Sequence, residues 1–491
     1  MVSRTSSRQP SLITTICCLG VLPLTACGQR DAVPVAAREL AVGTPDLSVT
    51  VLQRLTASAG QDGDRFGTAI AMSKDGSVIA IGSPARDESK VAGMAGKVGD
   101  AQPRSGAVYV FRKDGTDWQE KQVLMPFPTP DILNGFGTAV AISENGDRIL
   151  VGAPDQALAR GAAYVFHYNG SGWVPEFAYS HPLAKQSGHA VALSPRGDRA
   201  LIGRGTSAVV LQFEGTGWSA KEAESLKLPS GLCAVPQFPT SVRLADSGQV
   251  AFLGMSCVKE SSSGSPVVSF DAVVSYVDGR TGWSPYSLRI WEGTGGNSPV
   301  LVAANQDGSA VLAGRLFGGN VALVGNVGGV LRVTESAFAF RGAPFRAAPF
   351  LTQEGSIALV GTTKYPWERM RVSGSVEIYL NGEHGWTKAT EIEYPGARTA
   401  ERQEAAFGYA IAGSERGDVV AIGAPTWAPT DVAAVPVGAV YVLGITKRKG
   451  LRCRTARECG TGFCVDGFCC DKACGGRSEE HTSELQSRQC I

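Results

Sequence analysis

The sequence predicts an all-β fold assembled from seven copies of one structural unit. Seven times a glycine lies six residues before a second glycine, and each pair brackets a short aliphatic segment: Gly76/Gly82, Gly146/Gly152, Gly197/Gly203, Gly248/Gly254, Gly308/Gly314, Gly355/Gly361 and Gly417/Gly423. In the clearest copy, Asn145-Gly146 separates two β-prone runs, which is the pattern of a tight hairpin because both central turn positions need positive φ. Such a unit cannot bury its apolar face alone, so the copies must pack against one another.

Each second glycine is followed by a connection of variable length and a third β-prone run. In most copies a Gly/Asp turn then ends in a tryptophan, and a fourth, weaker run follows; these tryptophans are Trp118, Trp173, Trp218, Trp283 and Trp386. Four short strands in units of roughly 45–70 residues match the blades of a β-propeller. The inner runs, such as residues 69–72, are apolar throughout, as expected of strands covered on both faces. We therefore predict a seven-bladed β-propeller of four-stranded blades over residues 49–446. A β-sandwich explains neither the seven copies nor their shared register.

The order of these runs also predicts how the ring closes. The last copy ends at residues 440–443 without a fourth strand, and an unassigned β-prone run, residues 49–55, precedes the first copy. A ring left open would expose two sheet edges. We therefore predict that residues 49–55 complete the seventh blade by pairing beside residues 440–443.

Three copies share a further motif, a Phe-Gly pair followed by Gly-(Ala/Ser)-Pro. The three are Phe66-Gly67 with Gly82-Ser83-Pro84, Phe136-Gly137 with Gly152-Ala153-Pro154, and Phe407-Gly408 with Gly423-Ala424-Pro425. The motif resembles the FG-GAP repeat of propellers of the integrin α-chain type. The resemblance implies the same seven-bladed fold but no particular activity, since propellers of one geometry host many functions.

The resemblance also bears on metal binding. Calcium-binding repeats of the integrin type carry an Asp/Asn-rich loop between the first two strands, whereas here that connection is a short turn such as residues 73–76. Ca²⁺ takes six to eight oxygen ligands, which a turn of this length cannot supply. In the long segment 84–105, the acidic residues Asp87, Glu88 and Asp100 show no ligand spacing. We expect no metal site and no cofactor.

The N-terminus predicts export. Arg4 and Arg8 precede a short apolar core that ends in Leu24-Thr25-Ala26-Cys27. The core is too short to remain as a membrane span. Its last four residues resemble a bacterial lipobox, which implies cleavage before Cys27 and lipidation of that thiol, and Gly28 in place of aspartate implies sorting to the outer membrane. We predict a signal peptide over residues 1–26 and a flexible tether over 27–48. An ordinary signal peptide with a chance cysteine is the alternative.

Cys17 and Cys18 lie in the signal peptide and Cys490 in the last residues of the chain, and the other cysteines form two groups. Cys233 and Cys257 lie in the fourth copy, and a disulfide between them and two free thiols are equally compatible with the sequence. Six more lie in a segment too small for a hydrophobic core, residues 447–476, which predicts a disulfide-rich module with 15 possible pairings: Cys453, Cys459, Cys464, Cys469, Cys470 and Cys474. Zinc is the alternative, but this stretch has no Cys-x-x-Cys pair and no histidine between its cysteines.

The last residues, 477–491, differ in character from the rest of the chain. Residues 477–487 resemble the translation of a common sequencing-library adapter. We expect the cysteine-rich module to continue in the natural chain beyond Gly476, and we assign no function to His481 or Cys490.

Charge and motifs disfavour several classes of function. The formal net charge is +1 without a basic stripe, which argues against a nucleic-acid partner. The chain has no Gly-x-Ser-x-Gly elbow, His-Glu-x-x-His helix or phosphate-binding glycine loop. His189 has no visible catalytic partner, and among 45 acidic residues a pair such as Glu391/Glu393 is most simply a coincidence. We predict no catalytic residue.

Tryptophans outside the repeat register are the candidates for a ligand-binding face. The tryptophan found once per blade is expected to pack at a blade edge, whereas Trp291, Trp367 and Trp427 are out of register. Trp367 and Trp427 follow second glycines, where connections leave the ring and where propellers bind. We therefore expect these two residues and segment 84–105 to contact a ligand.

Together these features predict a lipid-anchored protein of the cell envelope, at the outer membrane, that serves recognition, adhesion or scaffolding without catalysis. The expected partner is an envelope or extracellular protein or polysaccharide, the membrane is contacted through the lipid anchor only, and no nucleic acid is involved. The alternative is a propeller that binds or degrades polysaccharide, with its site at the mouth of the central channel.

Overall fold

Seven sheets of four or five strands account for the predicted blades, and a small two-stranded sheet lies near the C-terminus. Within the described residues, no helix is long and apolar enough to cross a membrane. The structure is a computed structural model that describes residues 47–58, 63–84, 106–127, 135–155, 160–181, 186–219, 225–229, 232–233, 235–236, 240–245, 248–259, 268–279, 282–293, 300–315, 320–327, 330–339, 349–362, 374–382, 385–395, 405–428, 437–447, 453, 459, 464–465 and 468–469.

The strands of the first three blades follow one another in the chain. Blade 1 contains β2 (Ala69–Met72), β3 (Val78–Ser83), β4 (Ala107–Asp114) and β5 (Asp117–Leu124). Blade 2 contains β6 (Ala139–Ile142), β7 (Arg148–Ala153), β8 (Ala162–Tyr168) and β9 (Trp173–Ser180). Blade 3 contains β10 (Val191–Leu193), β11 (Arg199–Arg204), β12 (Ser207–Phe213) and β13 (Trp218–Ser219), with β14 (Ser225–Leu226) also beside β12.

Blades 4 to 6 repeat this order, and blade 7 combines both ends of the propeller. Blade 4 contains β15 (Val235–Pro236) and β16 (Ser241–Ala245), both beside β17 (Val250–Lys259), then β18 (Val268–Gly279) and β19 (Gly282–Gly293). Blade 5 contains β20 (Val300–Ala304), β21 (Ala310–Arg315), β22 (Asn320–Val327) and β23 (Val330–Ala339). Blade 6 contains β24 (Phe350–Leu351), β25 (Ile357–Thr362), β26 (Ser375–Gly382) and β27 (Gly385–Glu393). Blade 7 contains β28 (Ile411–Gly413), β29 (Val419–Ala424), β30 (Ala439–Lys447) and β1 (Leu47–Leu55), and the small sheet contains β31 (Cys464–Val465) and β32 (Phe468–Cys469).

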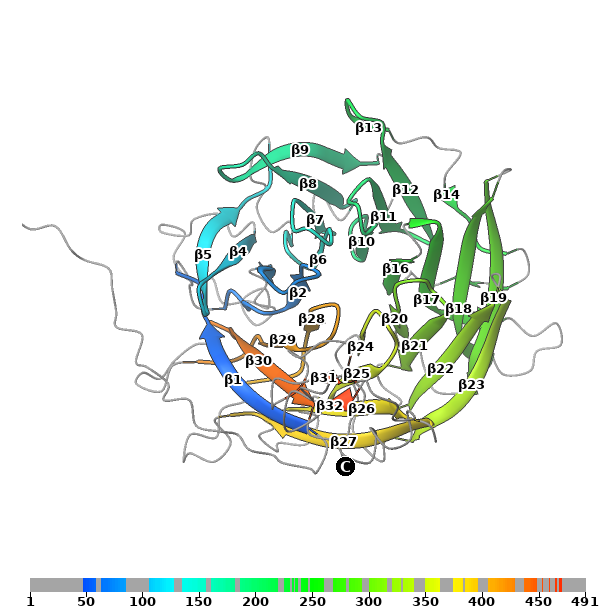
Figure 1. The fold of residues 1–491 in the computed structure, drawn as a ribbon. Helices are drawn as coiled ribbons and strands as arrows, with labels where there is room; N and C mark the ends of the chain where they lie inside the picture. The colour runs from blue at the N-terminus through cyan, green and yellow to red at the C-terminus, as the bar shows by residue number, and fades with distance from the viewer. Residues whose placement is uncertain are drawn as a thin grey trace, which may run out of the picture. The chain divides into compact units, whose positions relative to one another are not determined.

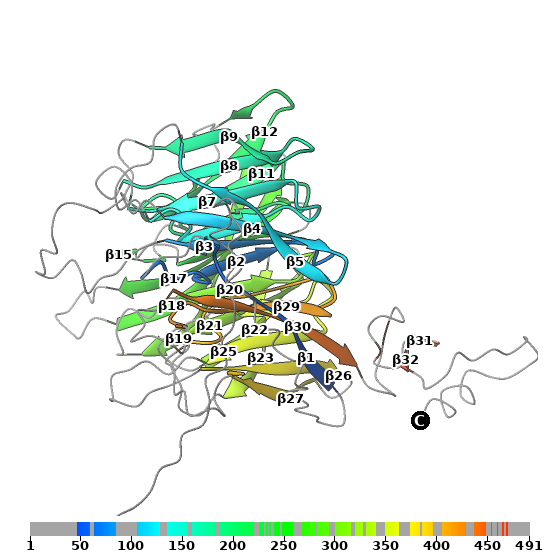
Figure 2. The ribbon, with the colours of Figure 1, turned by 90° about the vertical axis from the view of Figure 1, so that its left-hand side faces the viewer.

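The first described strand, β1, closes the ring. The innermost strands β2, β6, β10, β16, β20, β24 and β28 each contact the next around the centre of the ring, and β28 contacts β2 (Figure 1). β1 pairs antiparallel with β30, with Val49 opposite Ile445 and Leu55 opposite Val440. The two strands lie side by side in the axial view and in the side view (Figure 2). The predicted seven-bladed fold and its closure by residues 49–55 are both confirmed.

The first glycine of each pair is fixed by its backbone conformation. All seven have φ between 69° and 89°: Gly76, Gly146, Gly197, Gly248, Gly308, Gly355 and Gly417. This left-handed region is strained for residues that carry a Cβ. The repeat therefore keeps glycine at the turn between the first two strands of every blade, while the neighbouring residue varies.

In blades 1 and 2 the second position requires glycine for a different reason, because the next blade approaches too closely to leave room for a Cβ. A Cβ on Gly82 would lie 2.0 Å from the carbonyl oxygen of Gly137, and one on Gly152 would lie 1.9 Å from that of Gly188. Gly188 in turn donates its N–H to the oxygen of Gly203 in its own blade at 3.0 Å. Gly67, Gly137 and Gly188 are each hydrogen-bonded to the second glycine of their own blade, while their carbonyl oxygens lie close to the second glycine of the preceding blade.

The two ends of the ring differ in how far their connections vary. The turn between first and second strands has five residues in six blades, as in 73–77, and four in blade 4, 246–249. The connection between second and third strands ranges from two residues, 205–206, to twenty-three, 84–106. Because the strands are antiparallel, these two sets leave opposite ends of the ring. We call them the turn end and the loop end.

The repeat tryptophans of blades 1 and 2 are packing residues, as predicted. Trp118 and Trp173 are 2% and 3% exposed. The indole N–H of Trp118 donates to the carbonyl of Gly76 at 2.9 Å, and that of Trp173 to the carbonyl of Gly146 at 3.1 Å. These tryptophans therefore satisfy the turn carbonyl that the left-handed glycine leaves without a strand partner.

An ion pair within blade 2 contacts blade 3. The guanidinium of Arg148 donates from Nε and Nη2 to the two carboxylate oxygens of Glu176, both at 3.0 Å. It also lies over the ring of Phe213 in blade 3, 4.0 Å from the centroid, and the indole of Trp218 donates to Glu176 at 2.9 Å. Burial alone would raise the pKa of Glu176, but the hydrogen bonds from Arg148 and Trp218 and the Arg148 charge hold it below its usual range.

Glu176→Gln is expected to lower the free energy of unfolding at pH 7 by about 1–2 kcal/mol, because it removes a half-buried charge-assisted pair. A depressed native pKa contributes stability that is present above the unfolded value of 4.5 and is lost as pH falls through the native pKa. Urea unfolding between pH 3 and 7 should therefore show wild type and variant converging in acid. The exposed Glu393→Gln is the control and should parallel wild type; parallel curves for Glu176→Gln would contradict the assignment.

Candidate functional site

Backbone hydrogen bonds link the turns of neighbouring blades around the channel at the turn end. The residue two positions before the turn glycine donates its N–H to the carbonyl of its counterpart in the next blade: Gln306 to Gln353 (3.1 Å), Gln353 to Glu415 (3.2 Å), Glu415 to Lys74 (2.8 Å), Lys74 to Glu144 (2.8 Å) and Glu144 to Pro195 (2.9 Å). The counterpart in blade 4, Asp246, lies outside the described residues. We call these six residues the channel floor.

The side chains of the channel floor form an ion-paired network. Lys74 Nζ lies 3.4 Å from Glu144 Oε2 and 3.2 Å from Glu415 Oε1. Gln353, from blade 6, donates its Nε2 to Glu144 Oε1 of blade 2 at 3.1 Å. Burial alone would lower the pKa of Lys74, but hydrogen bonds and charges from Glu415 and Glu144 outweigh it and raise the pKa. The lysine is therefore held as a paired ammonium that cross-links blades, which is unlike the desolvated amine of a nucleophilic lysine.

Two cavities adjoin the channel floor. The smaller, about 190 Å³, is lined by floor residues and by apolar side chains of the innermost strands, which we call the collar: Met72, Ile142, Leu193, Leu244, Phe350 and Leu351. The larger, about 470 Å³, is lined by floor and turn residues: Lys74, Asp75, Glu144, Asn145, Ser414, Glu415, Arg416 and Asp418. Ligand pockets usually measure about 300–1,000 Å³. The smaller cavity thus suits only a small molecule, and a sugar chain does not fit there.

Comparison with known families identifies the repeat. The family model described as FG-GAP repeat matches residues 49–111. This segment runs from β1 into β4 and contains Phe66-Gly67 and Gly82-Ser83-Pro84. These residues are an FG-GAP repeat. No curated protein matches the chain significantly.

Several solved structures are similar to the chain at low sequence identity. The β-propeller domain of Myceliophteria thermophila Cps50 (Swd1) is 11% identical over 79% of this chain and 99% of its own, with a TM-score of 0.49. U3-55K is 11% identical over 80% and 98%, with a TM-score of 0.47. The periplasmic gluconolactonase PpgL of Pseudomonas aeruginosa is 15% identical over 67% and 85%, with a TM-score of 0.43. Likeness at this level assigns no activity.

Trp427, which was expected at a ligand-binding face, lies in the hydrophobic core. Its side chain is 8% exposed, belongs to the hydrophobic cluster between blades 6 and 7, and carries the guanidinium of Arg54 at 4.7 Å from the ring centroid. Its backbone N–H donates to Ala424 and its carbonyl accepts from Val437 and Gly438. An indole covered in this way offers no face for a ligand, so Trp427 is a packing residue, and its backbone is bonded to Val437 and Gly438 at the start of β30.

The other residues expected at a ligand face are not tested by the structure. Trp367 and residues 85–105 lie outside the described residues, and Trp291 lies on β19 without a described side chain. Cys27, the predicted lipidation site, also lies outside them.

The sequence holds two acid–base candidates, the pair Glu391/Glu393 and His189, and the structure shows what surrounds each. Glu391 lies opposite Glu377 in the β26–β27 pairing, and Lys388 Nζ bridges the two carboxylates at 2.8 Å and 2.5 Å, so Glu391 is paired across the sheet rather than with Glu393. The side chain of His189 reaches solvent. The protein around it desolvates the imidazole and lowers its pKa, and the charge of Asp155 offsets this lowering only in part.

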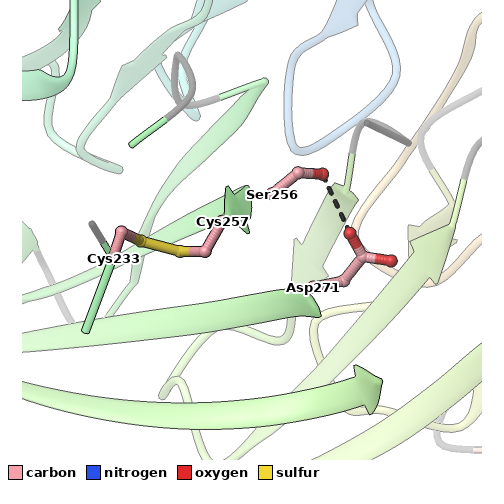
Figure 3. Close-up of a disulfide and its surroundings, with 4 residues drawn as sticks. All are labelled: Cys233, Ser256, Cys257 and Asp271. Atoms are coloured by element: carbon pink, nitrogen blue, oxygen red, sulfur yellow. Dashed lines mark hydrogen bonds between the residues drawn. A yellow bond between two sulfur atoms is a disulfide. The ribbon is translucent and has the colours of Figure 1, made fainter. Parts of the chain in front are cut away.

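Cys233 and Cys257 form a disulfide in blade 4 (Figure 3), with their Cα atoms 5.2 Å apart. Cys257, on β17, is fully buried in the hydrophobic cluster of blades 3 and 4. Next to it, Ser256 donates to the buried carboxylate of Asp271 on β18 at 2.9 Å. The bond ties the segment before β15 to the second strand of the blade.

The C-terminal module contains two described disulfides, Cys453–Cys464 and Cys459–Cys469. Cys453, Cys459 and Cys469 lie close enough together to hold a metal ion as free thiolates. All three are oxidised in these disulfides, so the predicted disulfide-rich module is confirmed for the described cysteines. Cys470 and Cys474 lie outside the described residues.

Sequence reasoning did not find the channel floor. The pattern that could have found it is the second position before each turn glycine, which holds Lys74, Glu144 and Glu415 in three neighbouring blades of the ring. Superposing the seven copies would have placed these opposite charges on one rim.

Proposed function

We propose that the chain is an exported, lipid-anchored envelope protein that recognises a partner through the loop end of its propeller. The observation that carries this proposal is the contrast between the two ends. Turns at the turn end keep nearly one length, whereas connections at the loop end vary from two to twenty-three residues. A rigid scaffold with connections that vary at one end is typical of recognition.

The position of β1 supports an outward-facing loop end. Leu47 begins β1 opposite Lys447, and the nearby Gly444 pairs with Val419, which directly follows a turn of the turn end. A tether leading to Cys27 therefore joins the propeller at the turn end. The nineteen residues between can span up to about 60 Å. Anchoring at Cys27 would leave the loop end directed away from the membrane.

The paired charges of the channel floor favour recognition over a polysaccharide-degrading site built on those side chains. The collar cavity of about 190 Å³ is too small for a saccharide chain, and the acidic residues Glu144 and Glu415 that line the larger cavity of about 470 Å³ are both paired with Lys74. A partner that meets the ring from the loop end needs neither the floor nor the cavity.

The test is saturable binding of the full-length chain to isolated cell envelopes. A variant with residues 86–104 replaced by a short Gly/Ser linker should bind at least about tenfold more weakly, while Thr116→Ala with Ser171→Ala, in exposed hairpins at the turn end, should bind as wild type. Binding should survive EDTA, and Cys27→Ser should abolish incorporation of labelled palmitate.

Three outcomes would contradict the proposal. Equal binding by the linker variant and by the turn-end control would place the partner elsewhere than the β3–β4 connection. Loss of binding in EDTA would show that a metal site exists. Shortening of envelope polysaccharide by the wild-type chain would favour the enzyme.

A further inference from the structure

Four consecutive blades carry the same tight turn where the chain enters the innermost strand at the loop end. In blade 1 the carbonyl of Arg65 accepts hydrogen bonds from the N–H of Thr68 at 3.2 Å and from its hydroxyl at 2.7 Å. The backbone bond recurs in blades 7, 2 and 3: Tyr409 to Ala406, Thr138 to Gly135 and His189 to Gln186. The strands that follow these turns, β28, β2, β6 and β10, contact one another in that order around the centre of the ring (Figure 1). We call the first and last residues of the four turns the mouth arc.

The first residue of each turn has a left-handed backbone. Its φ is 56° at Arg65, 53° at Gln186 and 50° at Ala406, and 67° at Gly135. This conformation strains a residue that carries a Cβ but not glycine. Gly135 shows that the turn accepts glycine. Arg65 and Gln186 therefore keep long polar side chains at a conformational cost, and strain of this kind is characteristic of functional sites.

The turns of the mouth arc are held firmly between blades. Their second residue is bonded to the preceding blade: Phe66 donates its N–H to the carbonyl of Val437 at 3.1 Å, and Ser187 to that of Arg160 at 2.9 Å. The side chains of Phe66 and Ser187 are fully buried. The glycine that follows is bonded within its own blade. A surface fixed in this way loses little conformational freedom when a ligand binds.

The side chains of the mouth arc mostly both donate and accept hydrogen bonds. His189 is exposed, and five others are partly exposed: Arg65, Thr68, Thr138, Gln186 and Tyr409. Hydroxyls and the glutamine amide carry donors and acceptors together. Because burial lowers the pKa of His189, its imidazole is neutral at pH 7 and also offers one donor and one acceptor.

Among the described residues the mouth is polar on one side only. Thr240 of blade 4 occupies the position of Thr68, eight residues before the turn glycine, but its hydroxyl donates to the carbonyl of Val300 at 2.7 Å and accepts from its N–H at 3.0 Å. Val300 holds the same position in blade 5 and is buried. A ligand of the mouth arc would therefore lie over blades 7, 1, 2 and 3.

We propose that the mouth arc binds a saccharide, the exposed end of an envelope polysaccharide. This inference rests on the proposed function and narrows its partner to one class. Each sugar hydroxyl donates and accepts, as the groups of the mouth arc do. The ring of Tyr409 is partly exposed and offers an apolar face to the C–H side of a sugar ring.

A protein partner is matched less well by the described residues. Protein interfaces centre on apolar or aromatic anchors that become fully buried. The large apolar side chains exposed in the described part of the chain all lie on or directly after the outermost strands β1, β5, β9, β19 and β23, away from the mouth.

The probe is polysaccharide prepared by exhaustive protease digestion of isolated cell envelopes. The control ligand is the same material after periodate, which cleaves vicinal diols. The full-length chain should bind the untreated polysaccharide saturably and the oxidised form at least about tenfold more weakly.

The variant Arg65→Gly with Gln186→Gly should bind the polysaccharide at least about tenfold more weakly, because it removes two polar side chains. It should be at least as stable to urea as wild type, because it relieves the left-handed strain. Ala406→Gly relieves the same strain and removes only a methyl group, so this matched control should bind as wild type. His189→Ala, at an exposed position, should weaken binding at least about threefold.

Equal affinities of the double variant and of Ala406→Gly would overturn the proposal. A double variant that does not fold would overturn the strain argument, and unchanged binding by His189→Ala would then overturn the rest. Envelope binding that survives periodate but not protease would overturn the saccharide assignment while leaving the loop-end function in place. Absence of any binding to intact envelopes would instead remove the proposed function itself.

Discussion

Gly152→Ala is expected to prevent the propeller from reaching its native packing, with a loss of more than about 3 kcal/mol in the free energy of unfolding. Gly152 has an ordinary strand conformation, so the backbone of its own blade tolerates alanine. The obstacle is the next blade, because the added Cβ would lie 1.9 Å from the carbonyl oxygen of Gly188 and 2.8 Å from its carbonyl carbon. Backbone atoms cannot move aside without separating blades 2 and 3.

Blade 5 supplies the matched control. Gly314 occupies the same repeat position, but a Cβ there meets nothing closer than 3.8 Å, from Pro349 and Val321. Gly314→Ala should therefore stay within about 1 kcal/mol of wild type. Urea unfolding followed by near-UV circular dichroism measures both variants. Equal midpoints for Gly152→Ala and Gly314→Ala would show that the close approach between blades does not fix the second glycine.

Val49→Asp is expected to open the ring, with a cost of about 3–5 kcal/mol. Val49 is 2% exposed and lies in the cluster that joins blades 6 and 7, opposite Ile445. An aspartate there would bury a charge without a partner. It would also release the strand that completes blade 7, so limited proteolysis should cleave the N-terminal segment before the rest of the propeller.

Leu52→Asp is the control on the same strand. Leu52 is 46% exposed and lies at the bulge between Val51 and Gln53, where the pairing with β30 is interrupted. It should unfold within about 0.5 kcal/mol of wild type and resist the protease equally. A Leu52→Asp variant as unstable as Val49→Asp would mean that any charge on β1, rather than loss of its buried face, opens the ring.

The fold could be predicted from the sequence because its repeat is enforced by the backbone. Turn glycines such as Gly76 and Gly146 need positive φ, and second glycines such as Gly82 and Gly152 need the absence of a Cβ. The first need recurs in all seven blades and the second in blades 1, 2, 4 and 7, so both survive as a readable pattern. The place of β1 followed from counting strands, since one blade lacked its fourth.

The contacts between blades could not be predicted in this way. The hydrogen bond from Trp218 to Glu176 and the cross-link from Lys74 to Glu415 depend on which side chains of different blades come within reach, and that distance is set by the ring rather than by the repeat. Trp427 shows the same limit. Its position after a second glycine indicated an exposed connection, but its indole packs in the hydrophobic cluster of blades 6 and 7 under the guanidinium of Arg54.

The sequence did not decide whether Cys233 and Cys257 form a disulfide, and the reason is related. Cys233 and Cys257 are 24 residues apart, and their approach depends on the short strand β15, which pairs Pro236 with Cys257 itself. Strands this short leave little trace in a sequence.

The pairing of β1 with β30 also determines how the molecule would bear mechanical load. A pull on the segment before Leu47, applied by an anchor at Cys27 against a partner held at the opposite end, would act along β1 from the end where Lys447 lies. Force in that direction loads the hydrogen bonds of the ladder in shear and together, rather than peeling them apart one at a time. The strand that completes the ring would thus also be the one that resists detachment of the propeller from its anchor.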